Sequence, residues 1–206
     1  MKIIVIGAPC GGTSMVTRLL EKCGMYLGES LGSENIEFRR INELILEQNS
    51  FDWRIPIPKT LKLSSEIKEQ MCEFSLSFDQ NYQVGWKSPR ATFTFHLWTK
   101  ALAPEKVRIL WVIRPWKETA RSIEKFQMKH RKETISGIRM ARNLTQGVIR
   151  NLRGQNWIGT YYPNYFINWR QELEKIVNFL DLKIPADDSI IKNYIDEKLY
   201  HERIAK

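Results

Sequence analysis

Residues 2–14 read KIIVIGAPCGGTS, and this stretch decides the fold. Lys2 to Ile6 is almost wholly apolar, which is typical of a strand buried on both faces. A turn rich in glycine and proline follows from Gly7 to Gly12, and from Thr13 apolar residues recur at helical spacing until Gly24. A strand, a Gly-x4-Gly turn and a hydroxyl pair before a helix outline a phosphate-binding loop, whose backbone N–H groups and helix dipole face an anion.

The same alternation continues along the chain. Further strands are predicted at Gln83–Trp86, Val107–Ile113 and Gly159–Tyr162. Helices are predicted at about residues 37–47, 64–75, 95–104, 116–126 and 169–180, with one long or two shorter basic helices over 129–153 and a proline-interrupted loop at 51–58. Helices between short buried strands imply a parallel sheet covered on both faces. We therefore expect one α/β domain over residues 1–206, a P-loop NTPase-like parallel sheet flanked by helices, with helical insertions.

The amino-acid composition limits the classes of binding partner but does not select one of them. The 206 residues hold 32 Lys plus Arg against 23 Asp plus Glu, a formal net charge of +9, which suits nucleic acid, a phosphorylated cofactor or an acidic membrane surface. No recognised nucleic-acid module is visible, and no apolar run approaches the roughly 20 residues of a spanning helix. Cys10, Cys23 and Cys72 lack metal-ligand spacing, and their odd number argues against a disulfide framework. We expect a soluble, cytoplasmic protein that binds neither metal nor nucleic acid.

Two strand ends argue against hydrolysis of a magnesium nucleotide. A nucleotide-hydrolysing loop carries Lys before its last hydroxyl residue, and that place is Thr13. The strand Val107–Ile113 ends in Arg114, where a magnesium site would need a carboxylate. A cation there attracts phosphate and repels metal, so the pattern favours a phosphorylated ligand bound without metal.

Cations also follow the other strands. Arg114 and Ser122, about two helical turns apart, could hold a second phosphate through the Arg fork and the Ser hydroxyl. Lys87 and Arg90 follow the middle strand, where they either neutralise charge that develops on a transferred group or form a solvated basic turn.

Together these segments resemble the sulfotransferases that use 3′-phosphoadenosine 5′-phosphosulfate (PAPS), above all the bacterial ones. Gly7 to Ser14 is similar to the family loop G-x-x-R/K-S-G-T-[ST], and Arg114 with Ser122 eight positions later matches its second signature. The resemblance implies that the loop binds the 5′-phosphosulfate and that the second pair binds the 3′-phosphate. The implied loop residues are Ala8, Pro9, Cys10, Gly11, Gly12, Thr13 and Ser14.

The resemblance implies transfer of a sulfuryl group to the hydroxyl or amine of a small-molecule or glycan acceptor, with release of 3′-phosphoadenosine 5′-phosphate (PAP). Cys10 stands where the family has Lys or Arg, so Lys87 or Arg90 would have to supply that charge. Glu37 is the implied general base, with an ordinary exposed helix residue as the other reading.

Three alternatives stay open. One is a degenerate protein that binds PAP or PAPS without turnover, and another is a P-loop kinase-like nucleotide-binding protein. The third, a thiolate phosphatase built on Cys10, needs Arg six positions on, where the chain has Val16.

Overall fold

The computed structural model describes residues 1–51, 60–78, 83–102, 104–130 and 136–195. Its main sheet has the order β4-β1-β5-β6, and all three pairings are parallel. The four strands are β1 (Lys2–Ile6), β4 (Val84–Lys87), β5 (Val107–Ile113) and β6 (Trp157–Tyr161). The predicted parallel α/β sheet is therefore confirmed. The carboxyl ends of its strands share one edge, where ligands bind in such sheets.

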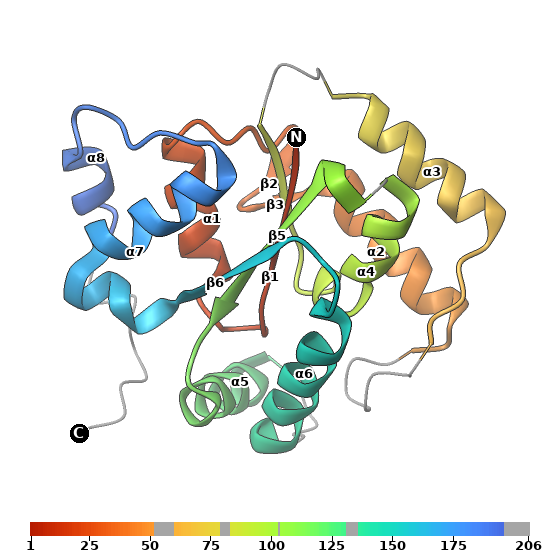
Figure 1. Ribbon diagram of the computed structural model, residues 1–206. Helices are drawn as coiled ribbons and strands as arrows, with labels where there is room; N and C mark the ends of the chain where they lie inside the picture. Colours follow the sequence, from red (N-terminus) through yellow and green to blue (C-terminus); the bar gives the residue numbers. More distant parts are fainter. Residues whose placement is uncertain (52–59, 79–82, 103, 131–135, 196–206) are drawn as a thin grey trace.

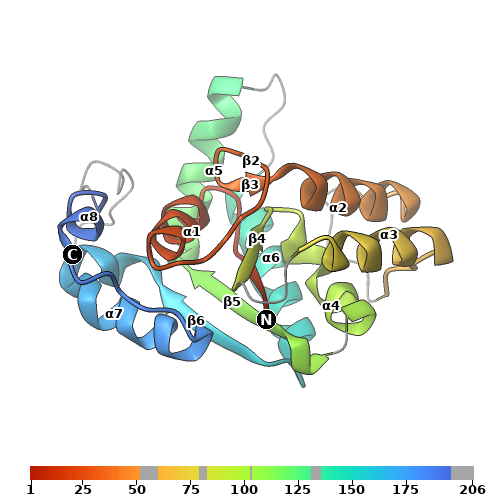
Figure 2. The ribbon, with the colours of Figure 1, turned by 90° about the horizontal axis from the view of Figure 1, so that it is seen from above.

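Helices cover both faces of this sheet, as Figures 1 and 2 show. Along β1, Ile3 and Val5 pack into one apolar cluster with the residues of α1 and α7, whereas Ile4 and Ile6 pack into the opposite cluster with α2, α3 and α4. Side chains alternate between the faces of a strand, so a strand that is apolar throughout can serve both clusters. The helices are α1 (Thr13–Lys22), α2 (Ile36–Gln48), α3 (Ser65–Leu76), α4 (Ala91–Leu102), α5 (Trp116–His130), α6 (Gly137–Leu152), α7 (Tyr165–Leu180) and α8 (Ser189–Lys192).

Most predicted elements lie within a few residues of their expected bounds. Ser64 caps α3, because its hydroxyl accepts a hydrogen bond from the Ile67 N–H at 3.3 Å. Of the basic segment 129–153, residues 129–130 end α5 and Gly137–Leu152 form α6, while residues 131–135 lie outside the described residues. The proline-interrupted loop at 51–58 lies almost wholly outside the described residues.

A short hairpin, β2 (Ser30–Leu31) paired antiparallel with β3 (Glu34–Asn35), was not predicted. Its connection is the two-residue turn Gly32-Ser33, in which Gly32 has φ of 63°. Glycine adopts this left-handed conformation at no steric cost, and a two-residue Gly-Ser link is a known hairpin signal. That dipeptide was the available sequence clue, but the flanking strands are only two residues long.

Buried Glu172 ties the end of β6 to α7. Its carboxylate accepts hydrogen bonds from Thr160 Oγ1 and the Tyr161 N–H, each at 2.9 Å, and from Asn164 Nδ2 at 2.8 Å. Lys175 adds an ion pair. Burial pushes the pKa of Glu172 up, but these partners outweigh burial and hold the pKa below its ordinary value of 4.5. The network fixes the turn Tyr162–Asn164, which contains Tyr162, a residue of the candidate site.

We expect Glu172→Gln to lower the free energy of unfolding by about 2–3 kcal/mol at pH 7, since the charge-assisted hydrogen bonds are lost. A carboxylate with a depressed folded-state pKa stabilises the protein above pH 4.5, and this contribution is lost as the pH falls through the folded-state pKa. Urea unfolding at several pH values should therefore show the two proteins converging in acid. Glu174→Gln, on the exposed part of the same helix, is the control. A difference independent of pH would contradict the assignment.

Candidate functional site

The Gly7–Gly12 loop connects β1 to α1 and curls back on itself. The Gly11 N–H donates to the Ala8 carbonyl at 2.9 Å, and Cys10 and Gly12 have φ of 59° and 90°. Thr92 of α4 holds the start of the loop, since its Oγ1 accepts from the Gly7 N–H at 3.1 Å and donates to the Gly7 carbonyl at 2.7 Å. These contacts fix the backbone amides ahead of α1, where an anion would bind.

The glycines of this loop are required by close packing. A Cβ at Gly12 would lie 2.1 Å from a ring carbon of Tyr162, and one at Gly11 would lie 2.7 Å from the Ala8 carbonyl oxygen. At Gly12, which is the N-cap of α1, no side chain caps the helix start. The first-turn N–H groups therefore face outward without a competing cap from that position.

Arg114 leaves β5 and turns back beneath the loop. Its side chain is 5% exposed, its Nη1 donates to the Cys10 carbonyl at 2.9 Å, and its Nε lies 3.2 Å from Glu118 of α5. The guanidinium carbon also lies 5.3 Å from the centre of the Tyr162 ring. Arg114 thus links the loop, the start of α5 and the β6–α7 turn.

One cavity of about 340 Å³ brings the predicted donor residues together. Loop residues, Arg114 and Ser122 meet there, although the loop and Ser122 lie more than 100 positions apart in the chain. Its described lining is Cys10, Gly12, Thr13, Ser14, Met15, Arg114, Ser122, Tyr162 and Tyr194. Ala8, Pro9 and Gly11 belong to the loop but lie outside this lining. Tyr162 and Tyr194 were not singled out from the sequence, where nothing distinguishes them from aromatic residues of the core.

Cys10 is half-buried, and its side chain packs against the apolar cluster that includes Phe93 and Leu144. Burial raises the pKa of the Cys10 thiol, although a hydrogen bond with Ser122 and the charge of Arg114 act in the opposite direction. The thiol is therefore the neutral form at pH 7, which disfavours the thiolate reading.

The other predicted cations lie beside the loop but are already paired. Lys87, at the end of β4, is 3% exposed, and its Nζ lies 3.2 Å from Glu34 Oε1 of the β2–β3 hairpin. Burial lowers the pKa of Lys87, partly offset by Glu34. Arg90 forms an ion pair with Glu43 of α2, at 2.7 Å.

Glu34, which the sequence analysis missed, is the carboxylate that the fold brings to Lys87. Among the described residues its Oε2 is buried without a hydrogen-bond partner, while the side chain as a whole is 20% exposed. Glu37 instead pairs with Arg40 at 2.5 Å, which lowers the pKa of Glu37 and makes it a weaker base. It lines a different cavity, of about 670 Å³, together with Tyr26 and Phe78.

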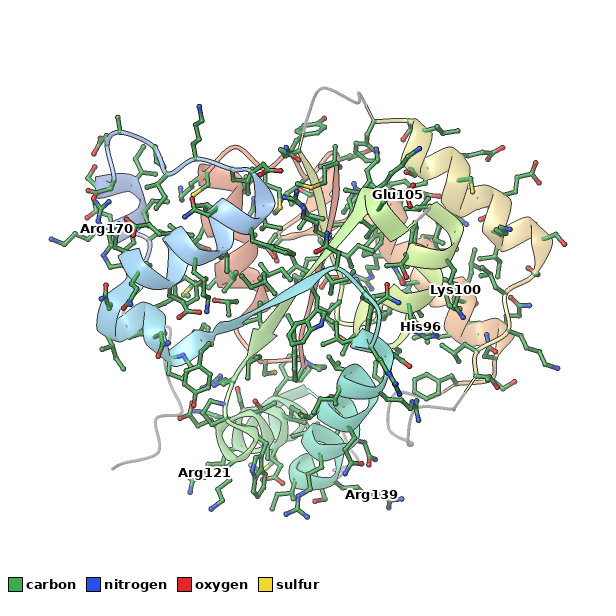
Figure 3. The ribbon with its side chains drawn as sticks, viewed as in Figure 1. His96, Lys100, Glu105, Arg121, Arg139 and Arg170 are labelled. Carbon is green, nitrogen blue, oxygen red and sulfur yellow. The ribbon has the colours of Figure 1, made fainter. Side chains whose placement is uncertain are left out.

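His96 lies in a structural environment. His96 on α4, labelled in Figure 3, has its Nδ1 buried without a hydrogen-bond partner among the described residues. Burial, and to a smaller extent the positive charges of Lys100 and Arg150, lower the pKa of His96 to about 4.

Among the described residues, no group of three or more His, Cys, Asp or Glu could hold a metal ion. In the same described part of the chain, none of the helices has both the length and the apolar character to cross a bilayer.

Comparison with known proteins places the fold. No family model and no curated protein matches the sequence. Solved structures do match. The sulfotransferase domain of the curacin biosynthetic pathway is 13% identical with a TM-score of 0.60, covering 99% of this chain and 92% of that one.

Two further structures agree. A sulfotransferase from Alicyclobacillus acidocaldarius is 13% identical with a TM-score of 0.57, covering 98% of this chain and 96% of that one. A sulfotransferase from Mycobacterium avium is 14% identical with a TM-score of 0.59, covering 98% and 69%. With a parallel sheet, a glycine loop after its first strand and these neighbours, the chain has the sulfotransferase fold.

Proposed function

We propose that this protein is a PAPS-dependent sulfotransferase, which moves a sulfuryl group to the hydroxyl or amine of a small-molecule or glycan acceptor and releases PAP. The observation that carries the proposal is the 340 Å³ cavity in which the loop, Arg114 and Ser122 meet. One nucleotide that carries a 5′-phosphosulfate and a 3′-phosphate would explain why two separate candidate anion-binding segments converge there.

The loop residues Ala8–Ser14 would hold the 5′-phosphosulfate through backbone N–H groups and the start of α1. Ser122 would donate its hydroxyl to the 3′-phosphate. Arg114 would attract that phosphate and at the same time hold the loop through the Cys10 carbonyl. Because Glu118 offsets part of the charge of Arg114, the Ser122 hydroxyl becomes the more discriminating contact.

We assign the chemistry to Glu34 and Lys87. Glu34 would take the proton from the acceptor hydroxyl or amine as the acceptor atom bonds to sulfur. The bond between sulfur and the bridging oxygen of the donor breaks, and both electrons leave with PAP. Lys87 would stabilise the charge that develops on the transferring group and the departing phosphate, and Arg90 could reach this region only by leaving Glu43.

A second candidate function is binding of PAP or PAPS without turnover. Cys10 favours it, because its side chain packs into an apolar cluster where the resembling enzymes carry a cation. Loss of one such cation costs about 2–4 kcal/mol of transition-state stabilisation, or a hundredfold or more in rate. Binding would suffer less, since the backbone donors and Ser122 remain.

Calorimetric titration tests the donor site without knowledge of the acceptor. We expect PAP to bind more tightly than AMP or Mg·ATP, and Ser122→Ala to weaken PAP binding about 10- to 100-fold, the range for a hydrogen bond to a charged group. The binding of AMP should change little.

Ser77→Ala, whose exposed hydroxyl donates only to the Phe74 carbonyl among the described contacts, is the control and should leave both affinities unchanged. Equal losses for PAP and AMP would remove the 3′-phosphate assignment. A preference for Mg·ATP would favour a nucleotide-dependent kinase or ATPase instead.

A further inference from the structure

A second cavity, of about 210 Å³, shares Arg114 with the donor cavity but is otherwise lined by different residues. It is enclosed by the carboxyl-terminal half of β5, the start of α5 and the middle of α6, which lie together at the lower end of the molecule in Figure 1. Ala8 and Gly11 of the loop complete its wall. None of the residues assigned to catalysis takes part in it.

The inner part of this cavity is apolar. Val112, Leu144 and Val148 are at most 2% exposed, and Trp111 contributes a half-buried ring. The Thr145 hydroxyl in the cavity wall already has a hydrogen-bond partner, because its Oγ1 donates to the Ala141 carbonyl at 2.9 Å. The surface that remains for a ligand is therefore suited to carbon rather than to polar groups.

The volume is enough for an aromatic ring. An apolar cavity of about 150 Å³ in a protein core binds benzene, so a cavity of 210 Å³ has room for a substituted ring.

The outer part of the cavity is positive. Trp116, 36% exposed, has the Arg142 guanidinium 4.8 Å and the Lys117 ammonium 5.6 Å from its ring centre. Among the described residues that line the cavity there is no Asp or Glu. Arg114 is the charged residue in this lining, and Glu118 offsets it. Arg142 and Lys117 do not line the cavity and contribute their positive charge from beside the lining residue Trp116.

We propose that this cavity binds a small aromatic anion, with its ring inside against Trp111 and Leu144 and its anionic group at the rim near Arg142 and Lys117. The proposal does not depend on sulfuryl transfer, since the cavity is lined by none of Ser122, Glu34 and Lys87, although Ala8, Gly11 and Arg114 are shared with the proposed donor segments. It assigns a separate small-molecule site beside the donor cavity.

Phenylacetate, benzyl alcohol and phenethylamine provide an anionic, a neutral and a cationic probe of one ring size. Ligand-observed NMR and calorimetry on the full chain measure their binding. We expect phenylacetate to bind most tightly and phenethylamine most weakly. Equal affinity for the anion and the cation would overturn the proposal.

Three variants locate the site. Thr145→Phe, which places a ring at the half-buried rim, should weaken phenylacetate binding at least tenfold by filling the space the ligand needs. Arg142→Gln should weaken phenylacetate about threefold and leave benzyl alcohol unchanged, as expected for an exposed charge. Arg139→Gln is the matched control on the same helix. Neither arginine lines the cavity, but Arg142 lies over the ring of the lining residue Trp116, whereas Arg139 points away from the sheet in Figure 3.

Thermal melting confirms that Thr145→Phe is folded, and its PAP titration reports separately on the donor cavity. If the folded Thr145→Phe protein binds phenylacetate as the parent does, the ligand lies elsewhere and the assignment is wrong. If Thr145→Phe does not fold, the test is the comparison of phenylacetate affinity between Arg142→Gln and Arg139→Gln. Equal affinities in these two variants would overturn the proposal.

Discussion

Gly12→Ala should abolish measurable PAP binding and lower the free energy of unfolding by about 2–5 kcal/mol, the combined cost of a left-handed alanine and an overpacked contact. The new Cβ would lie 2.1 Å from the Tyr162 ring, so the ring or the loop must move. Tyr162 in turn packs on Arg114, which holds the Cys10 carbonyl. Displacing one of these groups disturbs the whole donor cavity.

Gly24→Ala is the matched control for this variant. Gly24 has φ of 98°, close to the 90° of Gly12, but a Cβ there meets nothing within 4 Å. The free energy of unfolding of Gly24→Ala should therefore fall only by the conformational cost of about 1–2 kcal/mol, and this variant should keep its PAP affinity. Urea unfolding and PAP titration of both variants separate the two effects. If they behave alike, the contact with Tyr162 does not shape the site.

Glu34→Gln should reduce sulfuryl transfer about 10²–10⁴-fold, the range for a general base, and Lys87→Met about 10²–10³-fold, the range for a group that stabilises developing charge. Glu34→Gln should keep PAP affinity within about twofold, because Glu34 is not assigned to the donor phosphates and an effect confined to the transition state appears in the rate. Lys87→Met should also weaken PAP binding, because Lys87 is assigned to the phosphate that departs with PAP. The measurement is transfer from labelled PAPS to an acceptor found by screening hydroxyl and amine compounds.

Glu37→Gln is the control that decides between the two carboxylates, since Glu37 lies three positions away and pairs with Arg40. It should retain transfer within about threefold. A severe loss in Glu37→Gln with normal transfer in Glu34→Gln would reverse the assignment. Melting curves are needed alongside, because Glu34→Gln leaves the buried Lys87 ammonium without its partner.

The β1 and β5 strands show why much of the fold could be predicted. Both are apolar runs that end in glycine or arginine, and both occupy the predicted residues. Strands that are buried on both faces need no knowledge of their neighbours to be recognised. Because the four strands of the main sheet are parallel, the segments after Ile6 and Ile113 had to reach the same edge, so placing Arg114 near the loop followed from topology.

The chemistry beside the loop could not be predicted in the same way. Glu34 lies on a two-residue strand with no periodicity, and Lys87 is 53 positions away, so only the packed hairpin brings the pair together. Choosing Glu34 over Glu37 required knowing that Arg40, one helical turn from Glu37, pairs with the Glu37 carboxylate.

The sequence by itself determined the parallel sheet and the glycine loop before α1 and predicted two candidate anion-binding segments, because local periodicity and backbone freedom depend on neighbouring residues. Only the tertiary structure decided which contacts the side chains around the loop make. It buried Lys87 against Glu34, tied Arg114 to the Cys10 carbonyl and pressed Tyr162 onto Gly12. Each contact joins residues far apart in the chain, and its energy depends on burial and exact neighbours, which no local pattern records.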